Sequence, residues 1–305
     1  MKPRVLVIGS SNTDMIAKVP RLPRPGETIL GGQFTSAAGG KGANQAIAAA
    51  RAGGEVCFVG CVGKDVFGDQ SIAGFDREGI NLSYLRRKRG ASGVALISVA
   101  ADGQNSIAVA PGANAQLLPV DINRAQSAFH EADILLVQLE TPLPTVIAAI
   151  KQATKAHLPV ILNPAPAQPL SYKWLRCVSI ITPNETEAEL LTGVKVTNEA
   201  GAKRAAQALH RRGVKTVIIT LGDRGAFISS ETIHELMPAF ESEAVDTTAA
   251  GDVFNGALAV GLAERLGLRA AVQFANAAAA ISVTRLGAQP SAPKRKEIER
   301  LLRQR

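Results

Sequence analysis

Residues 245–256 read Val-Asp-Thr-Thr-Ala-Ala-Gly-Asp-Val-Phe-Asn-Gly, and no other stretch of the chain is as informative. Small and hydroxyl residues lead into Asp252, and an apolar run over residues 257–262 follows. The pattern predicts a turn and the start of a helix over residues 249–252. A helix start offers unpaired backbone N–H groups and the positive end of the helix dipole, which both suit an anion.

Asp252 is the chemically distinctive residue of this stretch. A carboxylate would repel a phosphate, but it is well placed to accept a proton from a hydroxyl that attacks the phosphate. Small side chains at Ala249, Ala250 and Gly251 would let the backbone approach that phosphate closely. The ordinary alternative, an acid favoured in the first helical turn by the dipole, stays open on this stretch alone.

The composition indicates a globular protein. The 305 residues are 46% hydrophobic, which is enough for one large α/β domain or for a core with a small lid. No apolar run reaches the ~20 residues of a membrane helix, and the run at residues 5–8 is too short for a signal peptide. Cys57, Cys61 and Cys177 have no histidine cluster nearby, so we expect reduced cysteines and a cytoplasmic protein without a membrane partner.

Half of the net charge of +8 lies in the last twelve positions, which hold six basic and two acidic residues. Single-stranded nucleic acid is usually bound by basic residues interleaved with aromatic ones, and this segment has no aromatic residue. We therefore expect a solvated terminal helix and no nucleic-acid partner.

Residues 4–9 form an apolar run that ends in glycine, as in a buried strand of a parallel sheet. Ser-Ser-Asn-Thr-Asp follows at its carboxyl end, where open α/β sheets bind ligands. Asn12 and Asp14 alternate with Ser11 and Thr13, so both can face one side and bind the hydroxyls of a sugar. Ordinary turn chemistry is the alternative.

From residue 55 onward, strand-like and helix-like segments alternate. Strands are expected at 56–62, 134–139, 160–162, 179–181 and 216–220, and helices at 65–78, 143–155, 184–191 and 200–211. This alternation predicts a three-layer α/β/α fold with a mainly parallel sheet.

Three segments break the alternation: 28–36, 94–100 and 106–110 have strand character, and turn residues 101–105 join the last two. We expect a small β-sheet lid at about 15–36 and 92–112, within one domain that spans residues 1–305. A glycine-rich loop at 37–44 lies between these segments and leads into an alanine-rich helix. It is no Walker A loop, because glycine follows Lys41 and the upstream spacing is wrong.

Several motifs in one order make the sequence similar to the ribokinase-like, phosphofructokinase-B-type carbohydrate kinases. They are Gly9-Ser-Ser-Asn-Thr-Asp14, Gly39-Gly-Lys-Gly-Ala-Asn44, Gln138-Leu-Glu140, Asn163-Pro-Ala-Pro166, Thr182-Pro-Asn-Glu-Thr-Glu187, Thr220-Leu-Gly222, Asp246-Thr-Thr-Ala-Ala-Gly-Asp252 and Gly287-Ala-Gln-Pro-Ser291. The resemblance implies ATP-dependent phosphorylation of the primary hydroxyl of D-ribose to ribose 5-phosphate, with Mg²⁺ and K⁺, in a homodimer joined through the lids.

The resemblance also implies residue roles. Asp252 is the catalytic base, and Ala249, Ala250 and Gly251 form the anion hole. The sugar contacts are Asn12, Asp14, Gly39, Gly40, Lys41, Asn44, Glu140 and Asp252. The nucleotide contacts are Asn184, Thr220, Leu221, Gly222, Asp223, Arg224, Gly225, Gly251 and Asn276. Glu187 is linked to magnesium, and Asp246, Thr248, Ser282, Arg285, Gly287 and Ser291 match a loop region that binds a monovalent cation. Related sequences usually have glycine in place of Ala249, and the position of Asn276 varies among them.

Other readings remain. The acceptor within this family can be 2-deoxyribose, fructose, a keto-deoxy sugar acid or a nucleoside. A regulator that binds sugar or nucleotide without catalysis is disfavoured by the intact Asp252, Gly251 and Lys41. A Rossmann oxidoreductase is disfavoured because no Gly-x-Gly-x-x-Gly follows the first strand.

Overall fold

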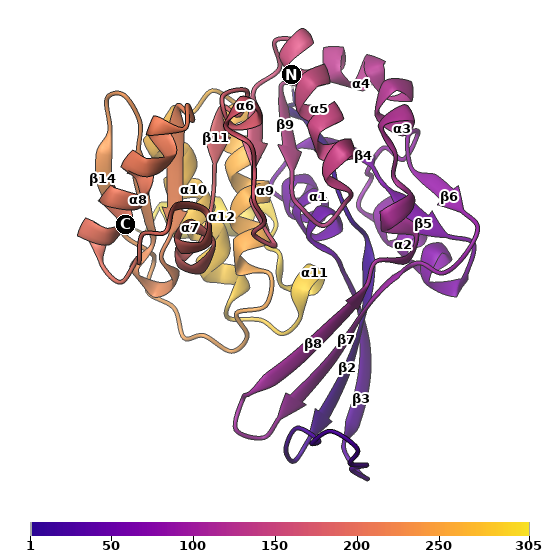
Figure 1. The fold of residues 1–305 in the computed structure, drawn as a ribbon. Helices are drawn as coiled ribbons and strands as arrows, with labels where there is room; N and C mark the ends of the chain where they lie inside the picture. Colours follow the sequence, from indigo (N-terminus) through magenta and orange to yellow (C-terminus); the bar gives the residue numbers. More distant parts are fainter. Residues whose placement is uncertain (1, 305) are drawn as a thin grey trace.

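The computed structural model describes residues 2–304 and is built around an eight-stranded sheet (Figure 1). Its strand order is β14-β13-β12-β11-β10-β9-β1-β4. The pairs from β4 to β12 are parallel, and those from β12 to β14 are antiparallel. The strands are β1 (Arg4–Ile8), β4 (Glu55–Val59), β9 (Ile134–Val137), β10 (Val160–Leu162), β11 (Ile180–Ile181), β12 (Thr216–Thr220), β13 (Ala226–Ser229) and β14 (His234–Met237).

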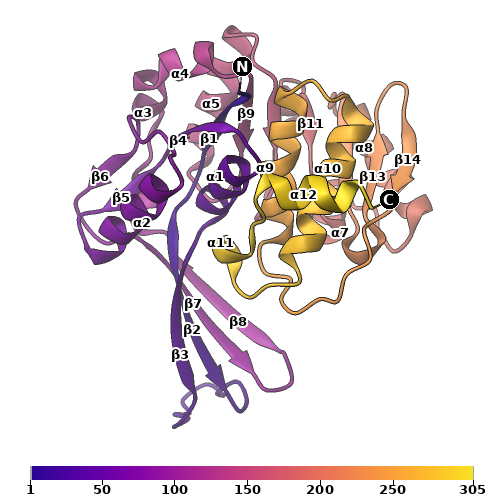
Figure 2. The ribbon, with the colours of Figure 1, turned by 180° about the vertical axis from the view of Figure 1, so that it is seen from behind.

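Helices cover both faces of this sheet, which confirms the predicted three-layer α/β/α fold (Figures 1 and 2). Val5 and Val7 of β1 face one core cluster, and Leu6 and Ile8 face the other, as strand alternation requires. The first cluster includes α1 (Lys41–Arg51), α9 (Ala250–Ala263), α10 (Leu268–Ser282) and α12 (Arg295–Leu302). The second includes α3 (Pro119–Arg124), α4 (Gln126–Glu131), α5 (Leu143–Lys155), α6 (Tyr172–Leu175), α7 (Glu185–Thr192) and α8 (Glu199–Arg211).

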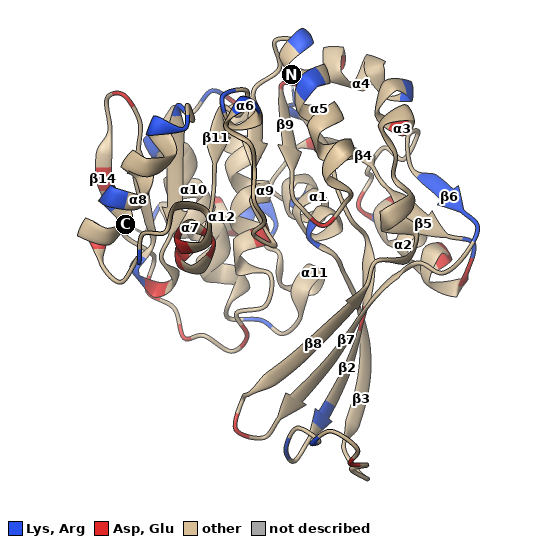
Figure 3. Cartoon of the chain, in the orientation of Figure 1, with Lys and Arg blue, Asp and Glu red and all other residues tan. Residues whose placement is uncertain are grey.

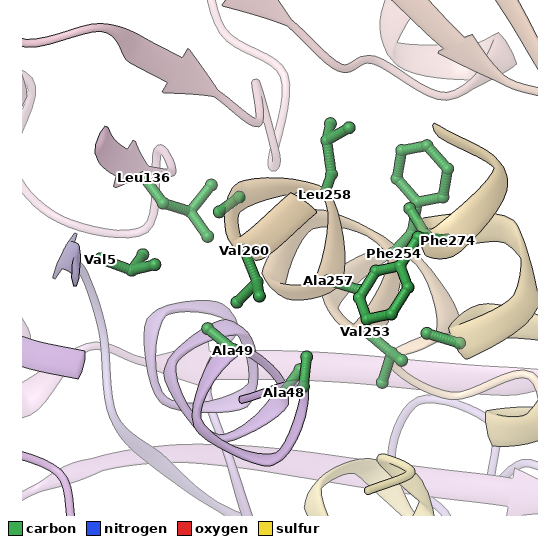
Figure 4. Packing of buried hydrophobic residues seen from close by; sticks show 14 of the residues in the cluster. Val5, Ala48, Ala49, Leu136, Val253, Phe254, Ala257, Leu258, Val260 and Phe274 are labelled. Atoms are coloured by element: carbon green, nitrogen blue, oxygen red, sulfur yellow. The ribbon is translucent and has the colours of Figure 1, made fainter. Parts of the chain in front are cut away.

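The central helix α9 packs against α1 and α10, as Figure 4 shows for Val253, Phe254 and Val260 beside Ala48 and Phe274. Gly256 permits this approach. A Cβ at Gly256 would lie 2.6 Å from the Gln45 carbonyl oxygen and 2.7 Å from Cβ of Ala48. The absence of that carbon lets the two helices touch along their backbones and holds their amino-terminal ends close together.

A separate four-stranded sheet extends away from the main body (Figure 1). Its order is β3-β2-β7-β8, with β2 (Asn12–Val19), β3 (Gln33–Gly39), β7 (Gly93–Ala100) and β8 (Asn105–Ala110). The expected lid segments contain β7, β8, most of β3 and residues 15–19 of β2, but the sequence indicates no strand over residues 12–19. Residues 12–14 begin this central strand instead of forming a loop, because β2 pairs with β3 and with β7 along its length.

The predicted strand at 56–62 is also divided. The chain leaves the main sheet at Gly60, and β5 (Cys61–Gly63) pairs with β6 (Arg86–Lys88) in a two-stranded sheet. The basic residues of β6 appear in blue in Figure 3. The neighbouring helix α2 (Val66–Arg77) begins after Asp65, whose carboxylate accepts a hydrogen bond from the Gly68 N–H.

The terminal helix α12 is less solvated than expected, because Ile298 is fully buried and Arg295 forms ion pairs with Glu264 and Glu299. Two short 3₁₀ segments, η1 (Gly112–Gln116) and η2 (Gly222–Arg224), and α11 (Ala288–Ser291) complete the fold. Within residues 2–304, no helix has the length and apolar character needed to cross a membrane.

Candidate active site

The amino terminus of α9 opens into a cavity. The helix starts at Ala250, which confirms the predicted helix start, and Ala249 precedes it in the left-handed conformation with φ 60°. Gly251 and Asp252 lie in the first turn, where a helix provides no carbonyl for their N–H groups. A Cβ at Gly251 would meet no atom within 4 Å, so this glycine faces open space.

The cavity has a volume of about 190 Å³ and is lined by Lys41, Asn163, Asn184, Glu187 and Asp252, among others. Several lining residues directly follow strands of the main sheet: Asn163 follows β10, and Thr182 follows β11. The cavity therefore lies at the carboxyl ends of parallel strands, the place where open α/β sheets bind ligands.

Asp252 is 6% exposed and is held by two amides. Its Oδ2 accepts a hydrogen bond from Nδ2 of Asn44 at 2.9 Å, and its Oδ1 accepts one from Nε2 of Gln45 at 2.9 Å. Burial raises the pKa of Asp252 above its ordinary value, and this exceeds the opposing effects of Lys41 and the two amides. The result is a buried carboxyl that is more basic than an exposed one.

Lys41, the first residue of α1, lies within an acidic environment. Burial by itself would lower its pKa, but nearby carboxylates outweigh this effect and hold the pKa above the ordinary value. These carboxylates belong to Asp252, Glu140, Glu187 and Asp14. Lys41 is therefore a fixed positive charge beside the cavity.

Asn12 and Asp14 share one face of β2, as the alternation predicts. Asn12 is opposite a glycine on both neighbouring strands, Gly39 of β3 and Gly93 of β7. A Cβ at Gly39 would collide with the Asp14 carboxylate, and one at Gly93 would collide with Asn12. The glycines leave room for the two polar side chains.

Asn114 of η1 is a site residue that the sequence analysis missed. Its Nδ2 donates to Oδ1 of Asn12 at 2.7 Å, and its Oδ1 accepts the Ser11 N–H at 2.9 Å. These bonds fix the Asn12 amide and leave its NH₂ group for a ligand. No repeated pattern around Asn114 distinguishes it in the sequence.

Glu140 and Gly40 complete this side of the site. Glu140 Oε2 accepts hydrogen bonds from the Ser10 hydroxyl at 2.5 Å and from the Lys41 N–H at 3.0 Å. Gly40 caps α1 with φ 89°, and a Cβ there would lie 2.6 Å from the backbone nitrogen of Asn12. The glycine-rich loop thus packs directly on the strand that carries Asn12 and Asp14.

A second, mainly apolar cavity of about 440 Å³ adjoins the first, and both are lined by Thr247 and Ala250. Gly222, Asp223 and Asn276 line it, and Nδ2 of Asn276 donates to the carbonyls of residues 237 and 238 at 3.2 Å. Other residues that line it were not predicted from the sequence: Phe240, Ala244, Ala279, Ala280 and Val283. Those on α10 lie at helical spacing and resemble ordinary core positions.

The other predicted nucleotide residues have different surroundings. Thr220 lines the first cavity. Leu221 is buried in the core, and Gly225, with φ 98°, closes the turn before β13. Arg224 forms an ion pair with Glu185 at 3.2 Å and donates to the Thr197 carbonyl.

Asn184 and Glu187 form a capping box at the start of α7. Asn184 Oδ1 accepts the Glu187 N–H at 2.8 Å, and Glu187 Oε2 accepts the Asn184 N–H at 3.0 Å. Burial is the main reason why the pKa of Glu187 is raised. Both residues line the cavity, and no cluster of three acidic, histidine or cysteine residues in the described chain could hold a metal.

Two of the segments predicted to bind a monovalent cation are in contact. Asp246 accepts the Thr248 N–H through Oδ1 at 2.9 Å and the Gly287 N–H through Oδ2 at 2.8 Å. Burial opposes ionisation, but a hydrogen bond from the Thr248 side chain, together with these two N–H bonds, lowers the pKa of Asp246 below its ordinary value. Ser282 and Ser291 donate to carbonyls within their own turns, and the Arg285 guanidinium pairs with Glu297 at 2.5 Å.

The fold and the site together define an α/β phosphotransferase. Its features are a helix start that faces a cavity, a buried carboxyl with a lysine beside it, and a polar face suited to hydroxyls. The family model of the pfkB family carbohydrate kinases matches residues 2–295, and the chain belongs to this family.

Individual relatives agree with this assignment. The chain is 45% identical to ribokinase of Haemophilus influenzae, over 97% of both chains. It is 39% identical to deoxyribokinase of Salmonella typhi, over 95% of both chains. Arabidopsis thaliana ribokinase complexed with ribose and ATP has a similar structure, with a TM-score of 0.92, 35% identity and 99% of both chains covered.

Gly251 and Gly256 of α9 provide a matched pair of substitutions. We expect Gly251→Ala to fold at least as stably as the wild type, because its Cβ enters open space and alanine favours a helix. Its kcat should fall by about 10²-fold, since the methyl group obstructs an anion at the helix start. Gly256→Ala should instead lose roughly 1–3 kcal/mol of stability through overpacking against α1. Denaturant unfolding and steady-state kinetics of both variants check this, and a fully active Gly251→Ala would contradict it.

Sugar binding should weaken at acidic pH because of Asp14. Burial, followed by the neighbouring Glu140 and Asp252, raises the pKa of Asp14 to about 6. As an expected sugar contact, the Asp14 carboxylate would accept hydrogen bonds from sugar hydroxyls only when ionised, so affinity should be full above this value and decline as the pH falls through it. Calorimetric titration with sugar from about pH 5 to 8 measures this. An Asp14→Asn variant with the same pH dependence would assign the effect to another group.

Proposed function

We propose that this protein transfers the terminal phosphoryl group of ATP to the primary hydroxyl of D-ribose. The placement of Asp252 carries the proposal, because this carboxyl lies in the first turn of a helix that opens into the cavity. The relatives named ribokinase, one of them complexed with ribose and ATP, support the choice of both substrates. In this assignment, the polar face of β2 binds the sugar and the apolar cavity lined by Phe240 binds the adenine base.

The proposed chemistry requires little covalent participation by the protein. Asp252 accepts the proton of the attacking hydroxyl, whose oxygen forms a bond to the terminal phosphorus while the bond to the ADP oxygen breaks. The N–H groups of Gly251 and Asp252 stabilise the charge on the transferred group, and Lys41 adds a positive charge. The four-stranded sheet is proposed to act as a lid that excludes water, which would otherwise take the phosphoryl group.

Magnesium is proposed to bind between Glu187 and the phosphates. The capping box uses Oε2 of Glu187, so Oε1 is left for an outside partner. One carboxylate, phosphate oxygens and water form the donor set that Mg²⁺ prefers in kinases. Bound there, the ion would neutralise phosphate charge within an acidic site.

A monovalent cation such as K⁺ is proposed to bind at the loops of residues 246–248 and 282–291. Asp246 contributes one ionised carboxylate, which also accepts the N–H groups of Thr248 and Gly287 and a hydrogen bond from the Thr248 side chain. The other candidate ligands of the cation are uncharged oxygens, namely backbone carbonyls and the hydroxyl groups of Ser282 and Ser291. A set with one negative charge suits a singly charged ion, which would order the loop that precedes Ala249.

A coupled assay over a panel of sugars tests the function. We expect ribose to have the highest kcat/KM, and Asp252→Asn to reduce kcat by about 10²–10⁴-fold or more, because the amide cannot accept the proton. Replacing potassium by sodium at constant ionic strength should slow the wild type. Asp252→Asn with wild-type turnover would exclude Asp252 as the base, and equal rates in both salts would exclude the cation site.

2-Deoxyribose is the second candidate acceptor, since the deoxyribokinase is similar over nearly the whole chain. The Asn12 amide favours ribose: Asn114 occupies its Oδ1, and its NH₂ group is left for a hydroxyl that a deoxy sugar lacks. Leaving such a group unpaired costs roughly 1–3 kcal/mol, which predicts a preference of about 10–100-fold. Asn12→Met should reduce the ratio of kcat/KM for ribose to that for 2-deoxyribose. An unchanged ratio would show that Asn12 does not select the sugar.

We propose that a second copy of the chain covers the four-stranded sheet. Ile107 and Val109 are 56% and 53% exposed on the face of this sheet that also carries Asp14, and Phe34 and Leu96 are 68% and 53% exposed on the opposite face. Only β2 among its strands contains charged residues (Figure 3). A sheet with exposed apolar side chains and few charges is typical of a protein–protein interface. We expect sedimentation at twice the monomer mass of 31.8 kDa, and a shift toward monomer in Ile107→Lys. A monomeric wild type would refute the dimer.

A further inference from the structure

We propose that Gln45 and Gln138 are positioning residues that fix the orientation of the Asp252 carboxylate. The proposal rests on the role proposed above for Asp252 and extends the site to two side chains that do not line the cavity. Both glutamines are fully buried. Fully buried glutamines are uncommon, because each amide carries donors and an acceptor that need partners.

Gln45 connects the carboxylate to the sheet. Its Nε2 group donates to Oδ1 of Asp252 and to Oδ1 of Asn163, both at 2.9 Å. These two bonds use both hydrogens of the amide. Asn163 is also fixed, because its Nδ2 donates to the carbonyl of Thr182 at 3.2 Å. Asp252 is thereby linked through Gln45 to residues that follow β10 and β11.

Gln138 determines which way the Gln45 amide faces. A glutamine amide can turn over with little change of shape, which exchanges its donor and acceptor sides. In the reversed orientation, Oε1 of Gln45 would face the Asp252 carboxylate and repel it. Nε2 of Gln138 donates to Oε1 of Gln45 at 2.6 Å and so stabilises the orientation that directs the donor at Asp252.

The Gln138 amide lowers the stability of the fold, so packing does not explain its presence. Its Oε1 is buried and has no hydrogen-bond partner in the described chain, which costs free energy. This oxygen also excludes a side chain at residue 9, because a Cβ at Gly9 would collide with it. An apolar residue at position 138 would avoid the unpaired oxygen. We attribute the amide to its bond with Gln45.

The arrangement holds the carboxylate without competing for its proton. Asn44 and Gln45 are consecutive in α1 and donate to different oxygens of Asp252. Both donors are neutral amides that do not titrate near neutral pH, so they favour the ionised carboxylate throughout the working range. The remaining lone pairs of Asp252 are left for the reacting hydroxyl.

Methionine substitutions test the pair, because methionine has a similar length and no amide. Gln45→Met should lower kcat by about tenfold or more through the loss of a hydrogen bond to a charged group, with little change in sugar KM. The acidic limb of its pH–kcat profile should move to higher pH, since the lost bond favours the ionised form. Gln138→Met should cause a smaller change in the same direction. The double variant should resemble Gln45→Met, because Gln138 acts through Gln45.

A measurement made without substrate distinguishes a failure of this proposal from a failure of the proposed function. The ¹³C resonance of the Asp252 carboxyl, assigned by its absence in Asp252→Asn, can be titrated in the unliganded protein. Its midpoint should rise in Gln45→Met and, to a smaller extent, in Gln138→Met. This result does not depend on whether ribose is the acceptor, whereas the kinetic result does.

Thr145→Val is the matched control. Thr145 of α5 is fully buried and donates to the Leu117 carbonyl at 2.6 Å, so the variant also loses a buried hydrogen bond. We expect it to reduce stability without moving the pH profile or the Asp252 titration. Three outcomes would each overturn the proposal: an unchanged titration in Gln45→Met, equal shifts in Thr145→Val, or additive effects in the double variant.

Discussion

The contact between α1 and α9 is the constraint on which the rest of the site depends. Gly256 has no side chain, and its backbone lies against Gln45 and Ala48 of α1. This contact brings together two helix starts that are about two hundred residues apart in sequence. One contributes Lys41 and the amides that hold Asp252, and the other contributes Asp252 itself. A larger residue at the contact would separate the carboxylate from its donors.

Charge is the second organising feature. The lysine at the start of α1 lies among four carboxylates, so the cavity is an acidic environment for an incoming phosphate. Burial and mutual repulsion also raise the pKa of Asp14 to about 6. An incoming polyphosphate therefore needs positive groups in addition to Lys41. Backbone N–H groups of α9 and a divalent ion meet that need in the proposed mechanism.

The features that could be predicted from the sequence were local. The start of α9 follows from small residues before an acid, and β12 from a short β-branched run. The strand β2 was missed because its partner β7 lies about eighty residues further along the chain. The role of Asn114 depends on one hydrogen bond to Asn12, and the wall formed by α10 looks like ordinary core. These features arise from tertiary contacts that no local pattern encodes.

The open space beside Gly251 has a consequence for how sequence changes at this position are tolerated in a cell. Chaperones and proteases recognise exposed apolar surface and unfolded segments. A Cβ at Gly251 meets no atom within 4 Å, so an alanine there would neither expose apolar core nor unfold a segment. Such a change would leave abundance intact while lowering turnover by about 10²-fold. Quality control would therefore not eliminate the impaired chains, and they would accumulate at the level of the normal protein.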